Sequence, residues 1–85
     1  MTTEKVTKDV TDNLLSVCKA IAHFPEDVRL IPNTRENEIL IVAITSKHDV
    51  GVFIGKKGQM IAALRTIANS IGVRNGVRVN FDLME

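Results

Sequence analysis

The sequence has few aromatic residues and no long apolar segment. Its 85 residues include three phenylalanines, no tryptophan and no tyrosine, so a core must be built from Ile, Val and Leu. The longest uninterrupted apolar run, residues 39–44, is six residues long, whereas a membrane span needs ~20. No charged stretch leads into an apolar segment at the first residues, so we expect neither a signal peptide nor a membrane partner.

Cysteine is scarce as well. The one cysteine, Cys18, cannot form an internal disulfide, which predicts a reducing, cytoplasmic setting. Its place among helically spaced apolar residues predicts a core position. His23 and His48 have no cysteine or acid at metal-ligand spacing and no evident nucleophile partner, which argues against a zinc site and a catalytic triad. We therefore expect no cofactor and no enzymatic activity.

The charges nearly cancel overall but are unevenly distributed. The formal net charge is +1, yet residues 47–80 carry six basic side chains and one acidic one, for a local charge of +5. Screening limits the reach of each charge to about 8 Å at physiological salt, so a local patch can attract a polyanion. A solvated face with chance clustering is the alternative. The six basic residues are Lys47, Lys56, Lys57, Arg65, Arg74 and Arg78.

The first half of the chain predicts a helix followed by a hairpin. Apolar residues at helical spacing predict a helix over residues 3–23, which Phe24-Pro25 ends because the residue before a proline avoids the α region. Strands are predicted over residues 27–31 and 38–45, with a turn at residues 32–34. The apolar run inside the second strand predicts burial on both of its faces.

The second half predicts two helices and a last strand. Ser46 and Asp49 have the spacing of a capping box, which predicts the start of a short helix. Gly58 opens a second helix, and Gly72 is expected to end it as a C-cap. Strict alternation over residues 77–83 predicts a strand. The order α-β-β-α-α-β indicates an α+β fold, a three-stranded sheet covered on one face by three helices.

Two glycines three residues apart, Gly55 and Gly58, enclose two lysines between the predicted helices. Glycine permits a sharp turn and a close approach to the backbone, and a helix N-terminus attracts phosphate. A P-loop fits worse, because the glycine spacing is one residue short and Lys57 stands where a magnesium-binding Ser or Thr belongs. A phosphate-handling enzyme would also lack a general base. The pattern favours a nucleic-acid backbone as the ligand.

The segment Ile54-Gly55-Lys56-Lys57-Gly58, with Ile61 after it, resembles the signature of KH domains, whose GXXG loop clamps about four nucleotides of a single strand. The order of elements resembles the type II form of that domain. Residues 49–51 and 63–66 look like those of small bacterial single-KH proteins of the KhpA type. The resemblance covers essentially the whole chain, so residues 1–85 are expected to be one KH domain with its loop at 55–58.

The resemblance implies sequence-tolerant binding of single-stranded RNA without catalysis and without a small-molecule substrate, by a post-transcriptional regulator or RNA chaperone. The glycines would admit the strand, the lysines would contact phosphates, and the two isoleucines would form an apolar groove floor. Gln59 stands where such proteins often have a basic residue, which predicts a weaker grip. The expected RNA-binding residues are Ile54, Gly55, Lys56, Lys57, Gly58, Gln59, Ile61 and Arg65.

Several alternatives stay open on the sequence. The domain could act mainly by protein interaction, as a homodimer or as a heterodimer with a Jag/KhpB-type partner, with RNA contact secondary. Arg65 could equally lie on a solvated helix face, and Arg74 and Arg78 could extend the basic groove or lie apart from it. Phe53 and Met60 are predicted to pack in the core rather than to stack on bases.

Overall fold

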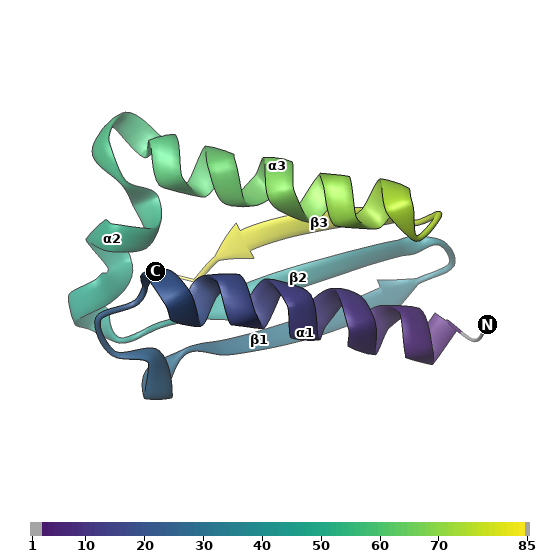
Figure 1. Ribbon diagram of the computed structural model, residues 1–85, viewed down its shortest axis with the longest axis horizontal. Coiled ribbons are helices and arrows are strands. Elements are labelled where there is room, and N and C mark those ends of the chain that lie inside the picture. The colour runs from purple at the N-terminus through teal and green to yellow at the C-terminus, as the bar shows by residue number, and fades with distance from the viewer. Residues whose placement is uncertain (1–2, 85) are drawn as a thin grey trace.

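Helices and strands follow one another in the predicted order in the computed structural model, which describes residues 3–84 (Figure 1). The helices are α1 (Thr3–Ile21), α2 (Val50–Ile54) and α3 (Gln59–Arg74), and the strands are β1 (Arg29–Arg35), β2 (Glu38–Ile44) and β3 (Arg78–Leu83). Short 3₁₀ turns η1 (Pro25–Asp27), η2 (Lys47–Asp49) and η3 (Lys56–Gly58) connect them. The predicted α+β class and element order are confirmed.

The three strands form a mixed sheet in the order β1-β2-β3. The β1–β2 pair is an antiparallel hairpin, whereas β2 and β3 run parallel, with Ile39 opposite Val79 and Ile41 opposite Phe81. A parallel pair needs a crossover connection, and α2, η3 and α3 supply it. Figure 1 shows α1 and α3 lying across one face of the sheet, with α2 at the end where β2 finishes.

The core lies between the sheet and the two long helices. One stripe of α1 is buried there, together with Phe53 of α2, Leu64 and Ala68 of α3, and the residues of β2 and β3 that face the helices. Cys18 is fully buried, and Met60 packs against the core, so the predicted core positions of Cys18, Phe53 and Met60 are confirmed. The buried α1 residues are Val6, Val10, Leu14 and Cys18. None of the helices within residues 3–84 combines the length and apolar character of a membrane span.

The prediction for β1 was wrong in its bounds. The expected turn at residues 32–34 lies inside the strand, which continues to Arg35, and the chain reverses at Glu36-Asn37 instead. Glu36 adopts a φ of 47° there. Pro32 is tolerated within β1 because β1 is an edge strand, where a missing N–H need not remove a hydrogen bond between strands.

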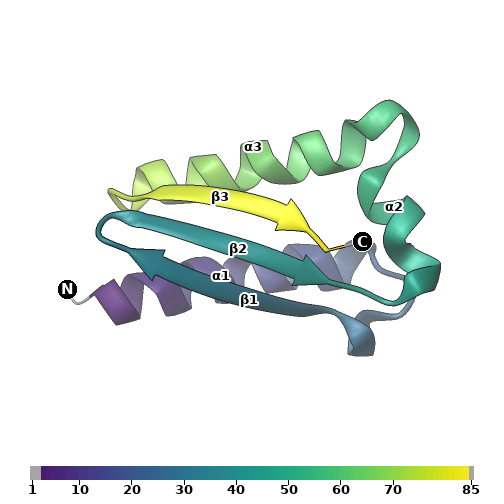
Figure 2. The same cartoon turned by 180° about the vertical axis from the view of Figure 1, so that it is seen from behind.

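The prediction that β2 is buried on both faces was also wrong. Ile39, Ile41 and Ala43 are buried, but Leu40 on the opposite face is exposed, because both long helices cover the same side of the sheet. Figure 2 shows this open face, with no helix in front of the strands. Ile31 of β1, which pairs with Val42, is also exposed on it.

Two helix ends differ from the prediction. Helix α1 ends at Ile21, two residues early, and α3 continues through Gly72 to Arg74. Gly72 is therefore not a C-cap but a contact point with β3. A Cβ at this position would lie 2.7 Å from the Val77 carbonyl oxygen and from Val79 Cγ2, so the glycine lets the helix approach the strand closely.

Candidate functional site

The glycine loop joins α2 to α3 through a tightly specified backbone path. The Gly55 N–H donates to the Gly51 carbonyl at 2.8 Å and ends α2, and the Gly58 N–H donates to the Gly55 carbonyl at 3.1 Å. Gly55, Lys57 and Gly58 have positive φ angles of 76°, 56° and 74°. Because side chains disfavour this region, the two glycines suit the bend between the helices.

Gly55 has a second reason to be glycine. A Cβ built there would lie 2.7 Å from both Cβ and the backbone nitrogen of Met60, whereas a Cβ on Gly58 would meet nothing within 4 Å. Met60 packs against the core, so the loop rests directly on a residue that cannot move freely. The first glycine fixes the loop against the body of the domain, and the second leaves its outer side open.

Helix α3 starts at Gln59, with Gly58 at the N-cap as predicted. No side chain caps this end. The Gln59 N–H donates to the Lys56 carbonyl, so this donor is used within the loop. The end of this 16-residue helix also presents the positive end of its dipole, which favours negative charge near its first turn.

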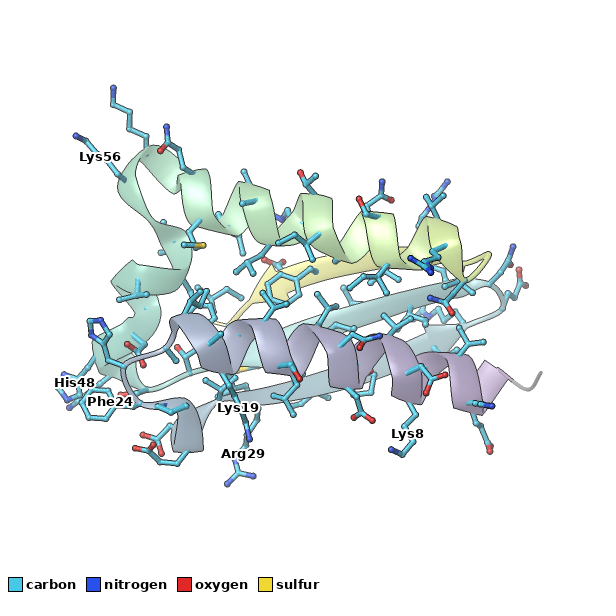
Figure 3. All side chains as sticks on the ribbon, in the orientation of Figure 1. Lys8, Lys19, Phe24, Arg29, His48 and Lys56 are labelled. Carbon is cyan, nitrogen blue, oxygen red and sulfur yellow. The ribbon has the colours of Figure 1, made fainter. Side chains whose placement is uncertain are left out.

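The predicted site residues around the loop have different degrees of exposure. Lys56, Lys57 and Gln59 are exposed, and Figure 3 shows Lys56 extending away from the body of the domain. Ile54 and Ile61 are half-buried, and Ile61 packs against the core. The structure thus brings mobile positive charge and partly exposed aliphatic surface to one end of the molecule.

Arg65 contacts β3 rather than the loop. Its Nε donates to the Phe81 carbonyl at 3.1 Å, and its guanidinium lies 3.3 Å from a carboxylate oxygen of Asp82. The side chain therefore connects the middle of α3 to the exposed edge of β3. Arg65 is exposed, as the alternative of a solvated helix face expected, but these contacts hold its side chain against β3. A groove of about 380 Å³ opens beside it, lined by Leu40, Arg65, Asn69, Val79, Asn80, Phe81 and Asp82.

The basic stretch of the sequence does not form one patch. Lys56 and Lys57 precede α3, and Arg74 is its last residue, so about 24 Å of helix separates them. Arg78 begins β3 at the same far end, near Glu38 across the sheet. The basic side chains are thus spread along the domain, with Lys47 and the two loop lysines at one end, Arg65 at the middle of α3, and the remaining two at the far end.

The structural role of Asp49 could not be predicted from the sequence. In place of the predicted capping box, Ser46 Oγ accepts from the His48 N–H at 3.2 Å. The Asp49 carboxylate is fully buried and accepts from the N–H groups of His23 and Phe24 at 3.1 and 2.9 Å. It joins the segment after α1 to the start of α2, and no local sequence signal predicts a partner 25 residues away. Within residues 3–84, no three His, Cys, Asp or Glu side chains group as metal ligands would.

Comparison with known proteins identifies the family. The model of the KH domain of KhpA and KhpB matches residues 11–83. The chain belongs to the KhpA/KhpB family of KH domains. Two relatives, each called RNA-binding protein KhpA, come from Chlamydia pneumoniae and Listeria monocytogenes. They are 36% and 31% identical over 72 residues, which cover 85% of this chain and 92% and 95% of theirs.

More distant matches show how far the likeness extends. The RNA-binding protein KhpA of Bacillus subtilis is 27% identical over 74 residues, 87% of this chain and 91% of its own. A crystal structure of a variant of Aquifex aeolicus Era bound to GDP.AlF4- shares the fold, with a TM-score of 0.57 at 18% identity. The match covers 92% of this chain but 29% of the Era chain.

Proposed function

We propose that this KH domain binds single-stranded RNA without catalysis, with the strand crossing the Gly55–Gly58 loop at the N-terminus of α3. The observation that carries the proposal is the loop itself, a fixed turn with two exposed lysines at the positive end of a long helix. The names of the KhpA relatives, all RNA-binding proteins, support the choice of RNA.

The geometry suggests how the residues share the work. Lys56 and Lys57 contact phosphates, the two glycines let the strand approach the backbone, and Ile54 and Ile61 lie beneath the bases. Gln59 adds a polar contact without charge at the first position of α3. Arg65 borders the groove along β3, where its ion pair with Asp82 reduces its attraction for a polyanion.

The test replaces both loop charges. We expect Lys56→Asp with Lys57→Asp to abolish binding of a short single-stranded RNA in fluorescence anisotropy while circular dichroism stays native. Aspartate suits position 57, because Asp tolerates a positive φ better than most residues. The control, Arg35→Asp with Arg74→Asp, changes the net charge equally at the end of β1 and the end of α3, which lie at the end of the domain opposite the loop. An unchanged affinity in the loop variant, or an equal loss in the control, contradicts the proposal.

Salt dependence provides a second measure. Single strands lose affinity with a slope of about −0.7 in log K against log salt for each phosphate neutralised. Two loop lysines therefore predict a slope near −1.4, which is a modest and local grip. We further propose that the domain acts in the cytoplasm as a post-transcriptional regulator or RNA chaperone, a setting that suits its one buried, unpaired thiol.

A second candidate function is protein interaction, favoured by the open face of the sheet, where Ile31 and Leu40 remain exposed. A second copy of the chain or a KhpB-type partner would bury this surface and hold two loops in one particle, which raises avidity. Sedimentation velocity with and without RNA tests it. A monomer that binds RNA tightly by itself contradicts any dependence on a partner.

A further inference from the structure

Two aromatic rings lie together on the surface at the end of the domain that carries the glycine loop. Phe24 follows α1 and His48 lies in η2, and their ring centroids are 5.7 Å apart with the planes tilted by 42°. The other two phenylalanines, Phe53 and Phe81, are buried in the core, whereas 39% of Phe24 remains exposed. Phe24 thus presents aromatic surface to solvent.

Both rings are mounted on a fixed backbone. The buried Asp49 carboxylate accepts from the Phe24 N–H at 2.9 Å and from the His23 N–H at 3.1 Å. The His48 N–H is bound by Ser46 Oγ, and His48 directly precedes Asp49. One buried carboxylate therefore holds both segments, so the two rings form a pre-organised pair rather than mobile surface side chains.

His48 is close to the loop along the chain, and the fold places Phe24 beside it. From η2 the chain enters α2, which has five residues and is therefore about 8 Å long, and then reaches Gly55. Figure 3 shows Phe24 and His48 at the same end of the molecule as Lys56. The charges beside the rings are mixed: Lys47, next to His48, is exposed, and so are Glu26 and Asp27 of η1, two and three residues after Phe24.

We propose that Phe24 and His48 form a stacking platform for an unpaired base of an RNA strand that extends beyond the loop. This inference rests on the proposed function of the loop. Aromatic side chains bind exposed bases by stacking, in a manner tolerant of sequence. The position of the rings at the same end of the domain as the lysine-bearing loop favours a nucleic acid strand over an apolar protein segment. The platform lengthens the binding site from about four nucleotides to one that continues across α2.

The experiment compares short and long RNA on three proteins. Affinities for a uridine tetramer and a uridine decamer are measured by NMR titration and anisotropy for wild type, Phe24→Leu and Phe24→Tyr. We expect Phe24→Leu to weaken decamer binding about tenfold, in the range of one lost base stack, and to leave the tetramer unchanged. Phe24→Tyr keeps an aromatic ring and should bind the decamer as tightly as wild type does. Leucine keeps apolar volume, and the Asp49 hydrogen bond uses the backbone, so the fold is retained.

The ring resonances provide a direct readout. In wild type, the Phe24 and His48 ring protons shift when the decamer is added and stay in place with the tetramer. Decamer binding that is equal in Phe24→Leu and wild type, or rings that do not shift, overturns the platform and leaves the loop proposal standing. Failure of wild type to bind either RNA overturns the proposed function itself. Rings that shift only on addition of a protein partner assign the surface to protein contact instead.

Discussion

At the scale of single residues, the loop shows how two glycines with similar φ angles can have different constraints. Gly55 combines a φ of 76° with a ψ of 171°, a region that is nearly exclusive to glycine, whereas Gly58 lies in the left-handed helical region at 74° and 16°. Gly55 also rests on Met60, while Gly58 faces open space. The two positions of one motif therefore tolerate substitution unequally.

We expect Gly55→Ala to destabilise the domain by roughly 2–5 kcal/mol, because backbone strain and the clash with Met60 add. Gly58→Asn should lower the free energy of unfolding by about 1 kcal/mol or less, since asparagine visits the left-handed region and meets no neighbour. Urea unfolding of both variants measures the difference. Equal losses would mean that neither the backbone conformation of Gly55 nor its contact with Met60 carries the expected cost.

Asp49 is a second residue whose effect extends beyond its own segment. The N–H groups of His23 and Phe24 donate to different carboxylate oxygens of Asp49. In Asp49→Asn, one of these oxygens becomes an NH₂ group, which cannot accept a hydrogen bond. One buried backbone donor then has no acceptor, and we expect a loss of about 1–3 kcal/mol in the free energy of unfolding. Chemical denaturation checks the magnitude. Asp12→Asn, on an exposed pair with Lys8, is the control and should change stability by well under 1 kcal/mol.

At the scale of elements, the contact between α3 and β3 depends on one glycine inside the helix. Replacing a helical glycine by alanine normally stabilises a protein by up to about 1 kcal/mol. At Gly72 we expect the opposite sign, a loss of about 1–3 kcal/mol, because the added methyl lies 2.7 Å from Val77 and Val79 of the adjacent segment.

Gly51 in α2 is the matched control. It is also helical, but a Cβ there meets nothing within 4 Å, so Gly51→Ala should raise the free energy of unfolding by about 0.5–1 kcal/mol. Thermal melts of the two variants should shift in opposite directions. If both melting temperatures shift in the same direction, the close approach of α3 to β3 does not require a glycine at position 72.

Local sequence patterns predicted the elements whose limits are set by local chemistry. Gly58 opens α3 as expected, and the periodicity of α1 identifies its buried stripe. The patterns failed where distant parts of the fold decide. The apolar run of β2 cannot show that both long helices cover one face of the sheet, and Pro32 cannot show that its strand lies at an edge.

The candidate site follows the same division. The glycines and lysines of the loop are adjacent in the sequence, so their spacing was enough to find them. Phe24 and His48 are far apart in the sequence and were noted for other reasons, as a helix end and as a rejected metal ligand. Their proximity depends on the Asp49 hydrogen bonds, which only the folded chain reveals.

At the scale of the whole molecule, burial of α1 against the sheet changes the acid–base behaviour of Cys18. Burial raises the pKa of its thiol to about 11 from a usual value of 9.0. Below pH 9 the thiol is protonated in both states. Between pH 9 and 11 the unfolded chain loses this proton and the folded chain keeps it, so stability falls across that window by about 2–3 kcal/mol.

The measurement is urea unfolding at several pH values from 8 to 11. Wild type should lose stability more steeply than Cys18→Ala, which lacks the thiol but keeps every lysine. The chain has no tyrosine, so no phenol titrates in the same range. Parallel slopes for the two proteins would contradict the effect of burial on the thiol.

The parallel pairing of β2 with β3 places the glycine loop inside the crossover connection, whereas the β1–β2 turn at Glu36-Asn37 lies outside it. A cut or a bulky insertion within the crossover would interrupt the connection between β2 and β3 that carries the loop. The Glu36-Asn37 turn is exposed and lies at the end of the domain opposite the loop (Figure 1). It is therefore the natural place for an inserted tag, a fluorophore or a second domain that leaves the end with the glycine loop intact.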